Sequence, residues 1–225
     1  ILEFAAKSVE SVDGKKKVTS DIIKDALQRG ELYYDKNGEE HFNIISALHK
    51  SIRNSDVDAG LYWLARMLEG GEDPLYISRR LMRFASEDIG NADPQALILA
   101  VSVKETVHFI GMPEAALALA QLVIYLSSSP KSNSVYRAYS EAKSDISSGK
   151  IYPVPLRIRN APTKLMKEIG YGKDYQYAHN TKAGVADMQC LPDELKERKY
   201  YVPKEIGFER EIKKRLEYFK KFKNK

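Results

Sequence analysis

Residues 71–130, GEDPLYISRRLMRFASEDIGNADPQALILAVSVKETVHFIGMPEAALALAQLVIYLSSSP, decide the fold, because the same helix punctuation recurs in them: a glycine that ends one helix and a proline that begins the next. A glycine precedes a proline by a few residues at each of positions 74, 94 and 113, and Asp73 and Asp93 stand directly before the first two prolines. Glycine adopts the left-handed conformation that ends a helix, Asp accepts from free N–H groups at the next helix start, and proline needs no N–H there. The pattern predicts successive helices of roughly 16 residues joined by tight turns.

The helices expected over residues 94–110 and 113–128 are apolar on nearly every side. Such helices are buried on several faces, whereas a surface helix carries a single apolar stripe. A single chain can bury one or two such helices. Covering both of them completely is easier if a partner chain packs against them. We therefore expect an oligomer. No alternating apolar and polar run of useful length is present, so the predicted fold class is all-α, a helical bundle.

Further helices are expected on either side of this segment. Apolar residues at helical spacing predict one over residues 41–53 and another opened by Asp56. Three prolines predict that residues 151–162 are extended on the surface. Beyond the centre, helices are expected over residues 132–147, 163–169 and 204–223.

Composition bounds the function. Hydrophobic residues make up 43% of the 225 and charged residues 30%, as in globular proteins. The net charge of +5 is concentrated in residues 196–225, which hold 12 Lys or Arg against 5 Glu, so pI alone does not indicate nucleic-acid binding. Cys190 is the only cysteine, which excludes an internal disulfide and fits a cytoplasmic protein. The longest apolar run is too short for a bilayer, so no membrane partner is expected.

Catalytic chemistry is not visible. The sequence holds no G-x-x-x-x-G-K-[ST] phosphate loop and no H-E-x-x-H, and its four histidines lack metal-ligand spacing. We therefore predict no catalytic, cofactor-binding or metal-binding residue in this chain. The pair Glu87 and Asp88 can serve as an acid/base dyad or as a salt bridge with Arg83, and the missing nucleophile favours the salt bridge.

A cluster of basic and aromatic residues offers an interface. Arg79, Arg80 and Arg83 on one expected helix can bind phosphate or bridge carboxylates of a neighbouring helix or subunit. The second interpretation is favoured because Glu69, Glu72, Glu87 and Asp88 lie close in sequence. The aromatic Trp63 fits a core or interface better than a base-stacking platform. The candidate oligomer interface comprises Trp63, Tyr76, Arg79, Arg80, Arg83, Glu87 and Asp88.

Two basic segments offer contacts to nucleic acid. One is the stretch around residues 157–167, with tyrosines at 152 and 171, and the other is the Lys-rich helix expected near the C-terminus. The alternatives are a solvated loop and an amphipathic helix whose apolar stripe packs on the body, and both are favoured over DNA contact. The candidate DNA contacts are Arg157, Arg159, Lys164 and Lys167.

A series of long motifs in one order resembles a known family. They are HFNIISALHKSIR from His41, LYWLARMLEGGEDPLY from Leu61, RRLMRFASEDIG from Arg79, ADP from Ala92, PKSN from Pro130, PVPL from Pro153, RNAPTKLM from Arg159 and GYG from Gly170. Together they resemble the RarA/MgsA family of AAA+ ATPases, which includes replication-associated recombination protein A and Werner-helicase-interacting protein. Asn54 and Arg157 depart from this pattern, in which Gly and His are usual.

The resemblance implies that the helical bundle is similar to the collar domain of clamp-loader subunits, the domain through which subunits assemble. Residues 1–30 are then the end of an AAA+ lid subdomain, and residues 31–225 a C-terminal helical oligomerisation domain. The family implies a homotetramer acting with DNA at replication forks, with single-strand-binding or other replication proteins as partners, in a bacterial, nucleoid-associated setting. ATP and Mg belong to an ATPase domain that we expect upstream. The alternative function is a DNA- or partner-binding module built from residues 157–167 and the C-terminal helix.

Overall fold

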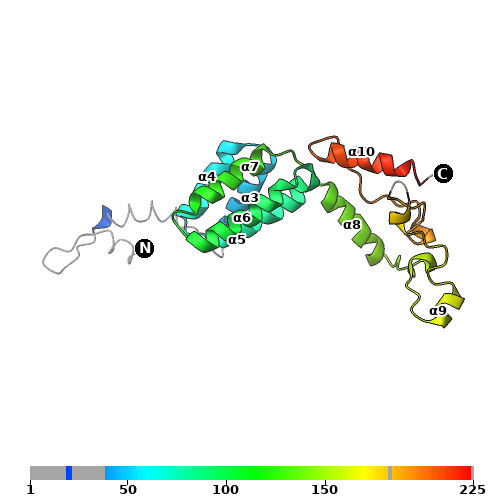
Figure 1. Cartoon of the computed structure of the whole chain (residues 1–225). Helices are drawn as coiled ribbons and strands as arrows, with labels where there is room; N and C mark the ends of the chain where they lie inside the picture. The colour runs from blue at the N-terminus through cyan, green and yellow to red at the C-terminus, as the bar shows by residue number, and fades with distance from the viewer. Residues whose placement is uncertain (1–18, 22–38, 182–183, 224–225) are drawn as a thin grey trace. The chain divides into compact units, whose positions relative to one another are not determined.

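The computed structural model describes residues 19–21, 39–181 and 184–223 of the chain (Figure 1). Within those ranges the secondary structure is helical and contains no strand, which confirms the predicted all-α class. The boundary predicted between residues 30 and 31 lies outside the described residues. The described residues divide into two compact units: unit 1 holds those up to Arg83 together with residues 99–128, and unit 2 holds residues 84–98 together with those from Ser129 onward.

Unit 1 is a helical bundle with an apolar core. Helix α4 packs on both α3 and α7, and the approach of α4 to α7 is close at Gly60, where a Cβ would lie 3.0 Å from Val123 Cγ1. Fully buried residues such as Leu48 and Leu122 line the core, and each is worth roughly 1.5–3 kcal/mol of hydrophobic stabilisation. The helices of this unit are α3 (Glu39–Arg53), α4 (Val57–Glu69), α5 (Pro74–Phe84), most of α6 (Gln95–Ile110) and α7 (Ala116–Ser128).

The predicted helix punctuation is confirmed. Gly71, Gly90 and Gly111 all have positive φ, at 78°, 53° and 70°, so each occupies the left-handed region that glycine favours. Three aspartates cap the helices that follow. The hydrogen bonds run from Ala59 N to Asp56 Oδ1 at 3.0 Å, from Leu75 N to Asp73 Oδ1 at 3.0 Å, and from Gln95 N to Asp93 Oδ1 at 3.1 Å.

Two helix boundaries differ from expectation within this segment. Helix α7 begins at Ala116 instead of residue 113, because Pro113 lies in a turn closed by hydrogen bonds from Ala115 N to Gly111 O and from Ala116 N to Pro113 O. Helix α5 is followed by a π-helical turn, η1 (Ala85–Ile89), and a 3₁₀ turn, η2 (Gly90–Ala92).

Unit 2 is built around α8 (Ser134–Ser147), which packs on η1 and η2. Helix α9 is capped as expected: Thr163 Oγ1 accepts from Met166 N, and Gly170 follows with a φ of 96°. Irregular chain and short turns make up much of the rest. The remaining elements are η3 (Leu156–Ile158), α9 (Lys164–Ile169), η4 (Ala178–Asn180), η5 (Asp193–Leu195) and α10 (Glu209–Lys220).

Helix α10 begins five residues later than the sequence predicts. Gly207 has a φ of +52°, and a Cβ there would lie 2.1 Å from the carbonyl oxygen of Ala92. Phe208 N donates to that same oxygen at 2.7 Å. This long-range contact holds residues 204–208 out of the helix. The apolar stripe of α10 is also less covered than expected, since Phe208, Leu216 and Phe219 remain 37–40% exposed.

Candidate functional site

Unit 1 exposes apolar side chains on α6, α7 and the turn between them. One side of these helices faces the core through residues such as Val107 and Leu119, so the opposite side must face solvent. Phe109 is 89% exposed and Leu117 is 79% exposed, which is unusual for such large apolar groups in a region that acts alone. We call the following residues the apolar surface: Val101, Phe109, Ile110, Met112, Leu117 and Ile124.

The aromatic residues predicted for the interface are engaged within unit 1. The Tyr76 ring lies 4.8 Å from the His41 ring, and the Arg79 guanidinium lies 5.4 Å from the Tyr76 centroid. His41 Nδ1 contacts Glu72 Oε2 at 2.7 Å, so this carboxylate is paired with a histidine instead of the neighbouring arginines. Tyr76 and Arg79 therefore belong to a small stacked cluster that runs from the buried His41 and Glu72 to the exposed Arg79.

The other residues of that set are scattered. Trp63 is half-buried on α4, with Arg66 5.5 Å from its ring. Arg83 is exposed, whereas Arg80 is half-buried and its Nε has no hydrogen-bond partner among the described residues. The acidic pair, Glu87 and Asp88, lies in η1 of unit 2. The structure places the seven residues on three elements, and whether any of them contacts a partner stays a prediction.

In unit 2, buried carboxylates hold the segment of residues 198–208, which we call the strap. Glu209, at its end, has no exposed surface. Its carboxylate accepts hydrogen bonds from Lys204 N at 2.6 Å and from the Tyr201 hydroxyl at 3.2 Å. Two serine hydroxyls also donate to it, that of Ser132 just before α8 at 3.0 Å and that of Ser134, the first residue of α8, at a shorter distance. Glu209 thus joins α10, the strap and the start of α8.

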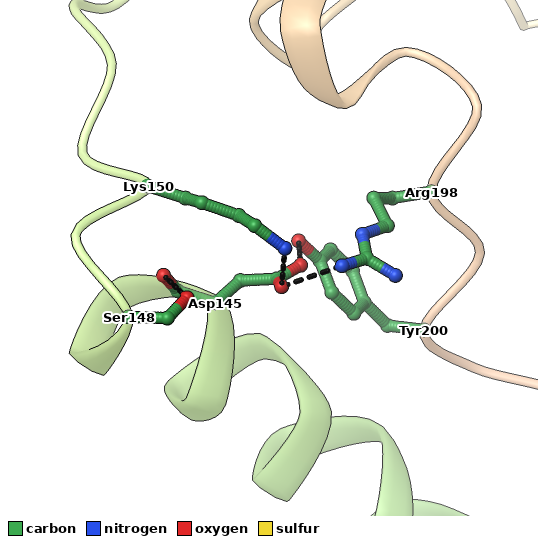
Figure 2. Close-up of polar contacts among 5 residues, drawn as sticks. All are labelled: Asp145, Ser148, Lys150, Arg198 and Tyr200. Carbon is green, nitrogen blue, oxygen red and sulfur yellow. Dashed lines mark hydrogen bonds and ion pairs between the residues drawn. The ribbon is translucent and has the colours of Figure 1, made fainter.

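The other end of the strap is held by Asp145 in the last turn of α8 (Figure 2). Arg198 Nη2 lies 2.7 Å and Lys150 Nζ 2.9 Å from Asp145 Oδ1, and the Tyr200 hydroxyl donates to Oδ2 at 3.0 Å. The hydrogen bond from Lys150 is the main cause that holds the Asp145 pKa below its ordinary value, against the effect of burial. Burial, followed by the contact with Asp145, raises the Tyr200 pKa. The strap therefore runs along α8 in the opposite direction.

An open pocket of about 270 Å³ lies between the strap and α8. Arg137 and Lys204 contribute cations to its wall and Glu141 a carboxylate, but Arg137 and Glu141 are already 3.7 Å apart. The remaining lining residues are Ser134, Tyr200, Val202 and Pro203.

Residues 151–181, which we call the hook, contain the predicted DNA contacts. Arg159 is held inside it: its Nε donates to Val154 O at 2.6 Å, its Nη1 donates to the Tyr171 hydroxyl at 3.0 Å, and its guanidinium lies 5.0 Å from the Tyr171 centroid. Arg157, Lys164 and Lys167 are exposed. Sequence reasoning grouped the four by charge, but Arg159 closes the hook while the other three face solvent.

Neither metal nor membrane chemistry is indicated in the described part of the chain. No group of three or more His, Cys, Asp or Glu side chains there is arranged to hold a metal ion. Among the described helices, none combines the length and hydropathy needed to span a bilayer.

The described residues form a helical region with the exposed apolar surface in unit 1 and the basic hook in unit 2. Comparison with known families identifies the family of this chain. Residues 54–220 match the family model described as "MgsA AAA+ ATPase C terminal", and residues 1–53 match one described as "AAA C-terminal domain". The chain therefore belongs to the MgsA, or RarA, family of AAA+ ATPases, as a C-terminal region. The junction between the two matches falls between α3 and α4, which pack together in unit 1.

Curated relatives agree with this assignment. "Replication-associated recombination protein A" of Coxiella burnetii is 48% identical over 98% of this chain and 50% of its own length. The Escherichia coli K12 protein of that name is 42% identical over 96% of the chain and 48% of its own length. "ATPase WRNIP1" of Dictyostelium discoideum is 45% identical over 83% of the chain and 23% of its own length. The chain spans about half the length of these two bacterial relatives.

Proposed function

We propose that this chain is the oligomerisation region of a replication-associated AAA+ ATPase, and that it assembles a tetramer through the apolar surface of unit 1. The observation that carries the proposal is the exposure of Phe109 and Leu117 on α6 and α7. Large exposed apolar side chains on a soluble region commonly mark a surface that another protein covers. Covering these two side chains alone is worth roughly 3–6 kcal/mol before the costs of association.

The sequence pattern supports the same surface. Helices α6 and α7 are apolar on nearly every side, and their core-facing residues, such as Val103 and Val123, are already buried. A second copy of the chain is the simplest cover because it brings an identical apolar surface, as in isologous interfaces. One isologous contact makes a dimer, so the proposed tetramer pairs two such dimers through a second contact.

The test is the solution mass of this chain, measured by light scattering across a concentration range. We expect the mass of four chains for the wild type. Leu117→Glu and Phe109→Glu should each reduce that mass, because a charge would be buried against apolar groups. Ile146→Glu, at a 60% exposed position of α8, is the control and should leave the mass unchanged. A wild-type chain that stays monomeric at all concentrations contradicts the proposal.

We further propose that the whole protein is an AAA+ ATPase of replication and recombination, acting on DNA with other replication proteins in the cytoplasm. The names of the relatives support this, and so does the fact that the chain spans only half of their length. ATP and Mg²⁺ would then be bound outside these 225 residues. ATP hydrolysis by this chain alone would contradict the proposal that ATP is bound outside these 225 residues.

A further inference from the structure

The hook is a closed structure with its own internal contacts. Gly172 N donates to Leu156 O at 2.9 Å, and this hydrogen bond joins the two limbs of the hook, which are the segments before and after α9. The limbs are also joined by Arg159, which binds both Val154 O and the Tyr171 hydroxyl. These contacts are internal to the hook, so its exposed side chains are presented from a frame that the chain itself holds together.

The charge of the hook is positive and turned outward. Residues 151–181 contain five Lys or Arg against Glu168 and Asp174. Arg159 is used inside, but the other four, Arg157, Lys164, Lys167 and Lys173, are exposed. Two of the cations of α10 differ, because Lys213 pairs with Glu205 and Lys214 lies 2.8 Å from Glu211. The exposed cations of the hook are available to phosphate groups.

Aromatic side chains accompany these cations. Tyr175 and Tyr177 are 52% and 54% exposed, and the Tyr177 ring lies 5.1 Å from that of His179. They follow α9 within a few residues, so they lie close in the chain to Lys167 and Lys173. Exposed rings beside cations suit ligands that carry both phosphates and flat bases.

The geometry points to unpaired bases rather than duplex. Base stacking on a tyrosine requires a base whose face is free, which a duplex does not offer. The helix of the hook, α9, has six residues, whereas major-groove readers present a longer helix or a β-ribbon. We propose that the hook binds single-stranded nucleic acid, with Arg157, Lys164 and Lys167 on the phosphates and Tyr175 and Tyr177 on the bases.

The experiment is fluorescence anisotropy of a labelled twenty-nucleotide oligo-dT, titrated with the whole chain at 50–200 mM salt. We expect binding that weakens with salt, with a slope of about −2 for three phosphate contacts on a single strand. Oligo-rU tests whether the sugar matters, and a duplex of equal length should bind more weakly.

Two variants separate the charges from the rings. Charge reversal of Arg157, Lys164 and Lys167 to Glu should abolish binding and its salt slope. Tyr175→Ala with Tyr177→Ala should weaken binding about tenfold or more while leaving the slope, because stacking is not screened by salt. The matched control reverses Lys50, Lys143 and Lys196, which are exposed and lie outside the hook. The control should bind like the wild type, and thermal unfolding should be the same for all variants.

Several outcomes overturn the assignment. They are an absence of binding at 50 mM salt, equal loss in the control, no effect of the tyrosine substitutions, and binding to anionic phospholipid vesicles in place of oligonucleotide. The result is independent of the oligomerisation proposal, because the hook lies in unit 2 and its variants should keep the wild-type mass in light scattering.

Discussion

Unit 1 and unit 2 are stabilised by different forces. In unit 1 the buried residues are mainly Leu, Ile, Val and Ala, and helices pack face to face. In unit 2 two buried carboxylates, Glu209 and Asp145, hold the strap through hydrogen bonds from several elements. Apolar packing has no direction, so unit 1 can extend its packing to a partner, whereas hydrogen bonds to a carboxylate specify one arrangement.

The difference predicts where a single change is most damaging. Leu122→Ala in the core of unit 1 should lower the free energy of unfolding by about 2–5 kcal/mol, because the fully buried side chain leaves a cavity. Urea unfolding measures this. Ile124→Ala, on the same helix at a 44% exposed position, should cost much less. Equal losses for the two would mean that the apolar surface is as well packed as the core.

The hydrogen bonds that hold the strap are best tested at the buried carboxylate of Glu209, which directly follows it. Glu209→Ala leaves Ser132, Ser134 and Tyr201 hydroxyls without their acceptor, which should cost about 2–4 kcal/mol locally. Hydrogen exchange should then speed up in the strap and α10 while unit 1 keeps its protection. Glu217→Ala, at an exposed position of the same helix, is the control. Faster exchange in unit 1 as well would show that the two units unfold together.

A change of pH should destabilise the strap of unit 2 without a mutation. Because the Asp145 pKa is lowered in the folded chain, its contribution to stability is present above the unfolded value of about 3.9 and is lost as pH falls through the folded value. The Tyr200 pKa is raised, so its contribution is present below about pH 10 and is lost as pH rises through the folded value. The NMR signals of Tyr200 should report both limits. Asp145→Asn should remove the acid limit, and an unchanged acid limit would mean that other carboxylates control the strap.

The smallest effect is expected at a helix cap. Asp56→Ala removes the acceptor of the Ala59 N–H, which should cost about 1 kcal/mol because the site is exposed and water can replace it. Thermal unfolding should show a small shift, and Asp58→Ala, two residues further on in the first turn of the same helix, should show less. A loss as large as that of Leu122→Ala would mean that α4 depends on its cap more than on its packing.

Local chemistry made much of the fold predictable. Helical spacing in residues 41–53 and the Gly, Asp and Pro punctuation act within a few residues, and the structure confirms both in α3 and in the caps of α4, α5 and α6. The motifs also led to the family that the comparison shows. The excess of apolar residues on α6 and α7 was readable too, although the sequence did not tell which side faces solvent.

Contacts between distant residues were decided only by the tertiary structure. Charge alone grouped Arg159 with Arg157, but packing gave Arg159 a partner at Tyr171 and left Arg157 exposed. Glu209 read as one more charge on a basic helix, yet the start of α8, 75 residues earlier, surrounds its carboxylate with donors. The sequence by itself determined most helix ends in unit 1, since caps and turns are local, whereas the start of α10 depended on a contact with the distant Ala92. Which charges are buried, and so which surfaces remain free to bind, depends on residues that only folding brings together.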